Sequence, residues 1–343
     1  MKPEMLKSVL LPLVKSAQDE VDRTAVWCLY PVCHCNAIDS HSQQKHQVLE
    51  SIAVGGKVFC ISNDLTGRLA RYLSADDPDL EVKPIEIARA STFNGFCNEH
   101  DTTLFAPIEK CALQKGCNDQ LRAFYLRALS YEIARQRMAL DFRVKFIDKI
   151  SCAEIPNDCL SFVKDLYDGY VDEIKERRLL LDSDIHHYWI PFWRATRTMS
   201  EYGWLWRTLP WNVGVSVTSV FSPVTEKQTA RYFNSHGCLY PRPMTTFSVV
   251  PNANQTHVVM IWPDSSAPFM ERLACDFEST DENVFLRLLN ECIFTRSEDY
   301  CISPALWNGL SKNEQQAIRF ATHHEYYRGE LAEIPEIIKR RNA

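Results

Sequence analysis

The most regular pattern in the chain lies between residues 117 and 181, where apolar side chains recur at spacings of three and four. Leu121 and Phe124 begin this series, and a second stretch repeats it after the turn-forming residues 151–158. Such a period places apolar side chains on one face of a helix. We therefore predict two long antiparallel helices, a helical hairpin within residues 113–181.

In the last part of the chain the pattern changes to alternation of apolar and polar residues, which is typical of strands. Residues 204–224 and 244–264 are predicted to be β-structure, and the turn signal at 251–255 divides the second stretch into two strands. Two more helices are predicted over 282–294 and 303–323, the second with Ser-Pro at its start.

These patterns divide the chain into three regions. Residues 1–112 combine an amphipathic first helix with turn-rich sequence, in which a helix near 43–53 and a strand near 55–61 are predicted. Residues 113–181 form the helical hairpin, and residues 182–343 are predicted to form a mixed α+β domain. The fold class is therefore α+β.

Composition excludes several classes of protein. The chain has 343 residues, a net charge of −6 and only 11 glycines. It contains neither GxGxxG after a strand nor GxxxxGK[ST], so the common nucleotide-binding loops are absent. Its first apolar run is short and contains Pro12, unlike a secretory leader, and no apolar stretch approaches the roughly 20 residues of a membrane span. Thirteen scattered cysteines favour a reducing compartment, and we expect a cytoplasmic protein.

The strongest candidate chemistry is a metal site in the first region. Cys28 and Cys33 are separated by four residues, and Cys97 precedes His100 by three. Zinc prefers a tetrahedron of thiolate and imidazole ligands, which two such pairs can supply together. Cys35 is the alternative ligand to Cys33. Unrelated buried cysteines are the competing interpretation.

A longer motif surrounds these pairs. It consists of two cysteines, a Ser-His step, a phenylalanine-rich segment ending in cysteine, and then His-Asp and Leu-Phe. In this chain the elements are Cys28, Cys33, Ser40, His41, Phe93, Gly95, Phe96, Cys97, His100, Asp101, Leu104 and Phe105. Through them, the first third of the chain resembles uncharacterised bacterial proteins that carry an HNH-like (ββα-metal) module.

The resemblance implies a zinc-anchored nuclease. His41 would be the general base that activates water, and Asp101, with Asp39 as a second candidate, would bind a catalytic Mg²⁺ or Mn²⁺ beside the structural Zn²⁺. The partner would be DNA or RNA. The setting that such modules suggest is bacterial phage defence.

Three departures from the HNH pattern favour a different function. Ser40 stands where an acidic ligand usually precedes the base, and residues 34–96 make a long insertion between the two pairs. No second Asn/His pair follows Cys97 at the usual offset. The alternative is therefore a non-catalytic, zinc-stabilised recognition or adaptor protein, which binds a protein or small ligand through its C-terminal domain.

Residues 64–83 contain the elements of a second nuclease pattern. Asp64 with Glu81 and Lys83 resembles an acid followed by Glu-x-Lys, but the surrounding loop is simply explained as a solvated turn before a strand.

Overall fold

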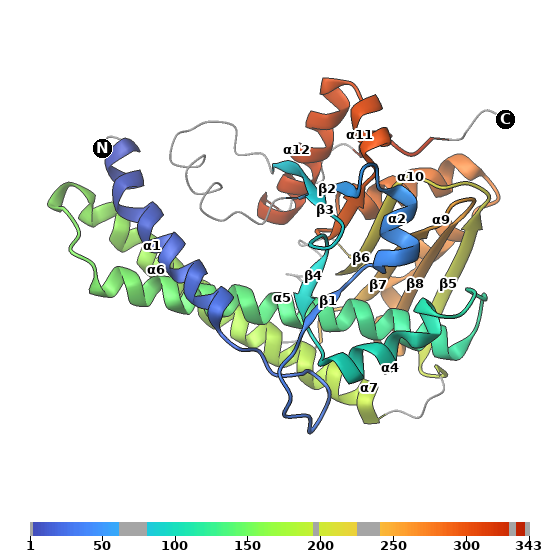
Figure 1. Cartoon of the computed structure of the whole chain (residues 1–343), viewed down its shortest axis with the longest axis horizontal. Helices are drawn as coiled ribbons and strands as arrows, with labels where there is room; N and C mark the ends of the chain where they lie inside the picture. Colours follow the sequence, from blue (N-terminus) through green and yellow to red (C-terminus); the bar gives the residue numbers. More distant parts are fainter. Residues whose placement is uncertain (1–2, 62–80, 195–198, 225–240, 329–333, 340–343) are drawn as a thin grey trace.

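The computed structural model describes residues 3–61, 81–194, 199–224, 241–328 and 334–339. Within these ranges helices and strands are mixed, which confirms the mixed character of the expected fold class. Figure 1 shows three parts: a large sheet flanked by helices, a long helical arm, and a small strand–strand–helix unit beside the sheet.

The elements are short in the first region and long afterwards. The strands are β1 (Asp39–His41), β2 (Lys57–Ile61), β3 (Val82–Glu86), β4 (Thr92–Asn94), β5 (Tyr202–Leu209), β6 (Val215–Phe221), β7 (Thr245–Pro251), β8 (Thr256–Pro263) and β9 (Tyr300–Ile302). The α-helices are α1 (Pro3–Arg23), α2 (Glu50–Ile52), α4 (Asn98–Glu109), α5 (Asn118–Cys152), α6 (Leu160–Asp184), α7 (Ile190–Arg194), α9 (Glu271–Glu278), α10 (Glu282–Phe294), α11 (Pro304–Gly309) and α12 (Lys312–Arg328). Shorter turns of π- or 3₁₀-helix are η1 (Lys45–Leu49), η2 (Asn157–Cys159), η3 (Ile185–Trp189) and η4 (Asp264–Phe269).

Among the described residues, seven strands form the main sheet in the order β3-β2-β9-β6-β7-β8-β5, and every neighbouring pair is antiparallel. The predicted turn at 251–255 joins β7 to β8, where Asn252 N–H donates to Gln255 O at 2.8 Å. Strands β2 and β3 come from residues 1–112 and the other five from residues 182–343. The sheet thus draws on both of these predicted regions.

Both faces of the main sheet are covered, which explains why its central strands β6, β7 and β8 are buried along almost their whole length. In β8, Val258 and Met260 pack in the cluster that contains residues of α9 and α10. Val259 and Ile261, which point the opposite way, pack in the cluster that contains the first half of α5. The sheet therefore lies between two helical layers.

The helical arm is formed by α1, the second half of α5 and the first half of α6. As predicted, α5 and α6 are long helices that pack against each other. The arm has its own apolar cluster, in which Leu10 of α1 packs with Phe146 of α5 and Val163 of α6. It extends away from the main sheet (Figure 1).

One predicted helix is divided. The segment 303–323 forms α11 and α12, with a break at Leu310 and Ser311. Ser311 begins the second helix as a capping box: Glu314 N–H donates to Ser311 Oγ at 3.2 Å, and Ser311 N–H donates to a Glu314 carboxylate oxygen at 2.9 Å. This local signal outweighs the continuous apolar pattern.

Among the described residues, no helix is long and apolar enough to cross a membrane.

Candidate metal centre

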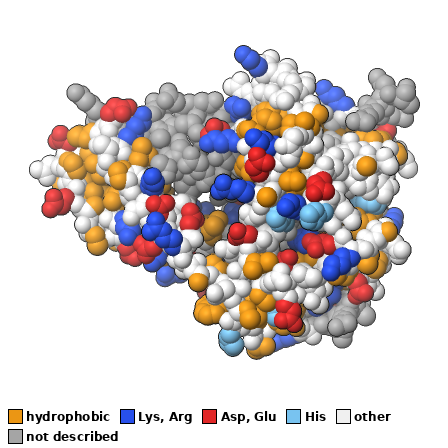
Figure 2. Space-filling view, in the orientation of Figure 1, with side chains coloured by type: hydrophobic (Ala, Val, Ile, Leu, Met, Phe, Trp, Pro, Cys, Tyr) orange, Lys and Arg blue, Asp and Glu red, His pale blue; other side chains and the backbone are white. Residues whose placement is uncertain are grey.

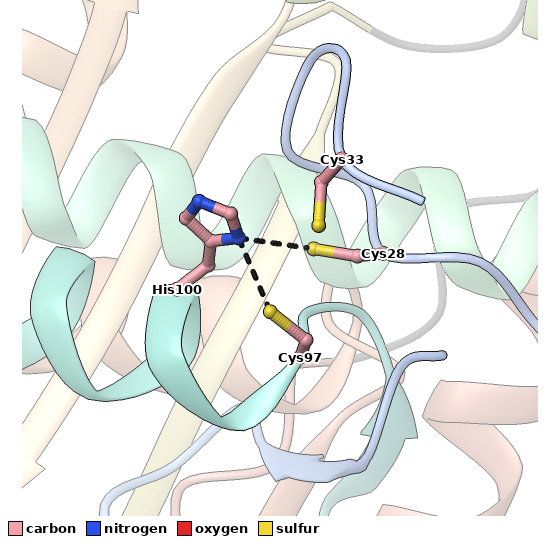
Figure 3. A group of neighbouring side chains, drawn as sticks. All are labelled: Cys28, Cys33, Cys97 and His100. Carbon is pink, nitrogen blue, oxygen red and sulfur yellow. Dashed lines mark hydrogen bonds between the residues drawn. The ribbon is translucent and has the colours of Figure 1, made fainter. Parts of the chain in front are cut away.

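The first cysteine pair lies on a tight loop that closes on itself. Cys28 N–H donates to Cys35 O at 2.9 Å, and Cys33 N–H donates to Tyr30 O at 3.1 Å. Val32, at the tip, has a φ of 59°, which lets the chain reverse sharply. The reversal brings the thiols of Cys28 and Cys33 to the same side of the loop (Figure 3).

The second pair lies where β4 leads into α4. Cys97 is the residue before the helix, and His100 lies in its first turn. Gly95 allows the chain to pass close to the ring of Phe93, since a Cβ at this position would lie 2.3 Å from a ring carbon. Gly95 O also accepts a hydrogen bond from Leu29 N at 2.8 Å, which joins this segment to the Cys28 loop.

The two pairs converge on one point (Figure 3). His100 Nδ1 lies 3.5 Å from Cys28 Sγ and 3.2 Å from Cys97 Sγ. Together with Cys33 Sγ these make four ligand atoms, which all lie within 4.8 Å of one another. Ligands around a tetrahedral zinc stand about 3.5–3.8 Å apart, given bond lengths of about 2.0–2.3 Å. The four side chains therefore fit a metal ion, and three thiols with one imidazole are a donor set typical of structural zinc.

Burial shapes the protonation of the cluster. It raises the pKa of the Cys28 thiol to about 11. A cation that binds here must therefore displace a proton from Cys28, which makes metal affinity increase with pH. Cys33 is more exposed than Cys28. Its pKa is lowered, and the largest cause is a hydrogen bond from the backbone N–H of Cys35.

The alternative ligand, Cys35, lies beside this group and not within it. Its side chain is exposed, and the neighbouring Cys33 thiol raises its pKa. Among the described residues, the group that converges is Cys28, Cys33, Cys97 and His100.

His41 lies on β1, the strand that pairs with β4, which in turn is followed by Cys97. Strand β1 pairs with β4 in antiparallel register, with His41 opposite Thr92. The His41 Nε2 atom lies 3.2 Å from Ile87 O. Because a carbonyl only accepts hydrogen bonds, Nε2 carries the proton, and in the neutral ring Nδ1 has a free lone pair. Burial is the largest influence on the pKa of His41 and lowers it.

The two candidate carboxylates lie on different sides of β1. Asp39 and His41 are two residues apart on the strand and share a face, and Asp39 is exposed. Asp101, in the first turn of α4, lies near Ser40, which is buried on the opposite face of β1, although the Ser40 hydroxyl and Asp101 Oδ1 have no hydrogen-bond partner among the described residues. Burial raises the pKa of Asp101, while Ser40 lowers it. In the described part of the chain, neither carboxylate belongs to a converging group of three or more His, Cys, Asp or Glu side chains.

Only two of the three residues of the second nuclease pattern, Glu81 and Lys83, lie within the described ranges. Asp64 lies outside the described residues, and Lys83 Nζ forms an ion pair with Glu81 at 2.9 Å.

One residue that contacts the cluster, Tyr30, was not among the predicted site residues. The ring of Tyr30 stacks on the imidazole of His100, with 3.8 Å between centroids and 9° between planes. Tyr30 lies inside the Cys28–Cys33 loop, and this position was the only available signal.

Comparison of the chain with protein-family models, with curated proteins and with solved structures gives no match.

Proposed function

We propose that the protein is a metal-dependent endonuclease that hydrolyses phosphodiesters of DNA or RNA, with a structural zinc held by Cys28, Cys33, Cys97 and His100. One observation carries this proposal. His41 lies on an antiparallel strand pair whose second strand, β4, is followed by Cys97 and then by α4, the helix that carries His100. A strand–strand–helix unit anchored by a metal is the arrangement expected of an HNH-like module.

The state of His41 supports the role of general base. Its Nε2–H is engaged by Ile87 O, so Nδ1 is the atom that would take a proton from water. Because burial lowers its pKa, the ring is neutral near pH 7 and can accept that proton. A bound Mg²⁺ or Mn²⁺ would stabilise charge on the phosphate and on the leaving oxygen. Asp101 and Asp39 are the candidate ligands for that ion.

The test is cleavage of plasmid DNA and of single-stranded RNA in the presence of Mn²⁺. The wild type is expected to cut at least one of them, and His41→Ala is expected to lose at least a hundredfold of the rate while it keeps its zinc. His46→Ala is the matched control. His46 lies in η1, is exposed and forms an ion pair with Glu50, so this variant should cut like the wild type.

A second candidate function is supported by the position of Asp101. Its carboxyl group lies near the neutral Ser40 on one face of β1, while Asp39 occupies the other face. The face of the molecule in Figure 2 shows Lys and Arg side chains interspersed with Asp and Glu. Both observations suit a zinc-stabilised recognition or adaptor protein. Zinc retention without cleavage of either substrate in Mg²⁺ or Mn²⁺ would favour the adaptor over the nuclease.

A further inference from the structure

Two cysteines from distant parts of the chain lie opposite each other on neighbouring strands of the main sheet. Cys60 of β2 and Cys301 of β9 are 241 positions apart in the sequence, yet they are directly paired in the register. Their sulfur atoms lie 3.0 Å apart. Both thiols are buried in a small apolar cluster with Leu49 and Ile52.

The backbone geometry at this pair is that of a cross-strand disulfide. Directly opposite residues in antiparallel strands have Cα atoms about 4.5–5.5 Å apart. A disulfide accepts Cα separations of about 4.4–6.8 Å and needs its sulfurs about 2.05 Å apart. The sulfurs of Cys60 and Cys301 therefore need to approach by only about 1 Å, which a small change of the side-chain torsions provides.

The pair lies at a short junction of the sheet. Within the described ranges, β2 pairs with β3 over five positions but with β9 over only two, Phe59 with Ile302 and Cys60 with Cys301. The β2–β3 strand pair is thus joined to the other strands of the sheet by a short ladder. A covalent bond at this position would reinforce it.

We propose that Cys60 and Cys301 are a redox pair, which a peroxide oxidises to a disulfide that fastens the β2–β3 strand pair to β9. In the first step one thiol reduces the peroxide O–O bond, which yields a sulfenic acid and, from hydrogen peroxide, one water. The sulfur of the second thiol then attacks the sulfenic sulfur and expels a second water. Two protons and two electrons leave the thiols, and one peroxide becomes two waters.

The disulfide would brace the segment that carries His41. The chain that follows β3 provides Ile87 O, which accepts the His41 hydrogen bond. Asp299, two residues before Cys301, accepts a hydrogen bond from the Ser42 hydroxyl. One of the two joined strands, β9, is thus preceded by a residue that holds the His41 region, and the other, β2, pairs with β3, which is followed by Ile87. The disulfide itself does not depend on the nuclease proposal.

The environment predicts slow oxidation. The neighbouring Cys60 thiol and burial both raise the pKa of Cys301, so little thiolate is present near pH 7. Exposed thiols such as those of Cys152 and Cys275 should react earlier. This order of reaction can be measured in one time course.

The test is peptide mapping of the full chain after treatment with hydrogen peroxide, with free thiols then alkylated under denaturing conditions. The expected product is a peptide pair joined through Cys60 and Cys301, two hydrogens lighter than the thiols and separated by dithiothreitol. Cys159, equally buried but in the helical arm, is the internal control and should be recovered alkylated. The oxidised wild type should also melt at a higher temperature than Cys60→Ala treated in the same way.

The proposal is overturned if Cys60 and Cys301 are recovered as alkylated thiols, or as separate sulfinic acids, when Cys152 and Cys275 are fully oxidised. Mapping of the wild type gives this answer even if Cys60→Ala does not fold.

Discussion

Tyr30 and His100 are stacked nearly parallel, with 3.8 Å between their ring centroids. Tyr30 belongs to the loop between Cys28 and Cys33, and His100 belongs to α4. The stacking fixes the plane of the imidazole so that Nδ1 faces the sulfurs of Cys28 and Cys97. The two halves of the candidate metal centre are therefore in contact through these rings as well as through the four ligands.

Removing this ring should weaken metal binding. Neighbours that orient a ligand typically contribute 10–100-fold to metal affinity. We expect Tyr30→Ala to lose zinc to a competing chelator at a 10–100-fold lower chelator concentration than the wild type, because its imidazole is free to rotate. Tyr30→Phe keeps the stacked ring and should behave like the wild type. Equal metal retention in all three proteins would show that the stacking has no part in binding.

Metal content is expected to depend on Cys97 and not on Cys35. We expect about one zinc per chain in the wild type by elemental analysis after washing with a weak chelator, as for a structural four-ligand site. Cys97→Ser should lose the zinc and lower the melting temperature, since a metal that holds distant segments together stabilises the fold. Cys35→Ser should keep the zinc and the wild-type melting temperature, because Cys35 lies outside the converging group. Loss of zinc in Cys35→Ser alone would reassign the ligands.

Gly95 is expected to be sensitive to a single methyl group. In Gly95→Ala the new Cβ would lie 2.3 Å from a carbon of the Phe93 ring, and the ring must move away from its edge contact with Tyr131. Such overpacking costs about 1–3 kcal/mol in the free energy of unfolding, measurable by denaturant titration.

Gly169→Ala is the matched control for this change. Gly169 lies within α6, and nothing is within 4 Å of the position of its Cβ. There the methyl group should stabilise the helix by about 0.5–1 kcal/mol. The same sign of effect at both glycines would contradict the steric explanation.

Stability should decrease as the pH rises through the titration of Asp299. Burial raises the pKa of this carboxyl from 3.8 to about 6, although the Ser42 hydrogen bond and Arg135 oppose the shift. Between these values the folded chain holds a proton that the unfolded chain has released. The free energy of unfolding should therefore fall across this window by an amount on the order of 2–3 kcal/mol.

Asp299→Asn tests this effect, because an amide does not titrate. The variant should lack that part of the decline and be more stable than the wild type at pH 7.5, provided its amide oxygen still accepts from Ser42. Asp158→Asn, at an exposed position in the helical arm, is the control and should follow the wild-type pH profile. A wild-type profile in Asp299→Asn would assign the decline to other groups.

If the protein is a nuclease, its rate should depend on the protonation of His41. Burial lowers the pKa of this imidazole below the ordinary value of 6.5, so the neutral, proton-accepting form persists to lower pH. The rate of Mn²⁺-dependent cleavage should rise with pH and reach half of its maximum below pH 6.5. A midpoint well above pH 6.5 would argue against His41 as the base.

Elements with a local signal could be predicted from the amino-acid pattern alone. The three-to-four spacing after residue 117 specified α5 and α6, and alternation with the turn at 251–255 specified the β7–β8 hairpin. The short spacings of Cys28 with Cys33, and of Cys97 with His100, marked each half of the metal cluster, because ligands that share a loop or a helical turn are close in the sequence. Capping at Ser311 was also local, but the apolar pattern concealed it.

Which of these elements meet in space became visible only in the folded chain. The two ligand pairs converge because β1 pairs with β4 and the Cys28 loop is hydrogen-bonded to Gly95, contacts between segments that are far apart in the chain. Cys60 faces Cys301 for the same reason, since the partner of a strand is chosen by burial of both faces of the sheet and not by its own period. Periodicity describes one segment at a time, whereas a site requires the relative positions of several.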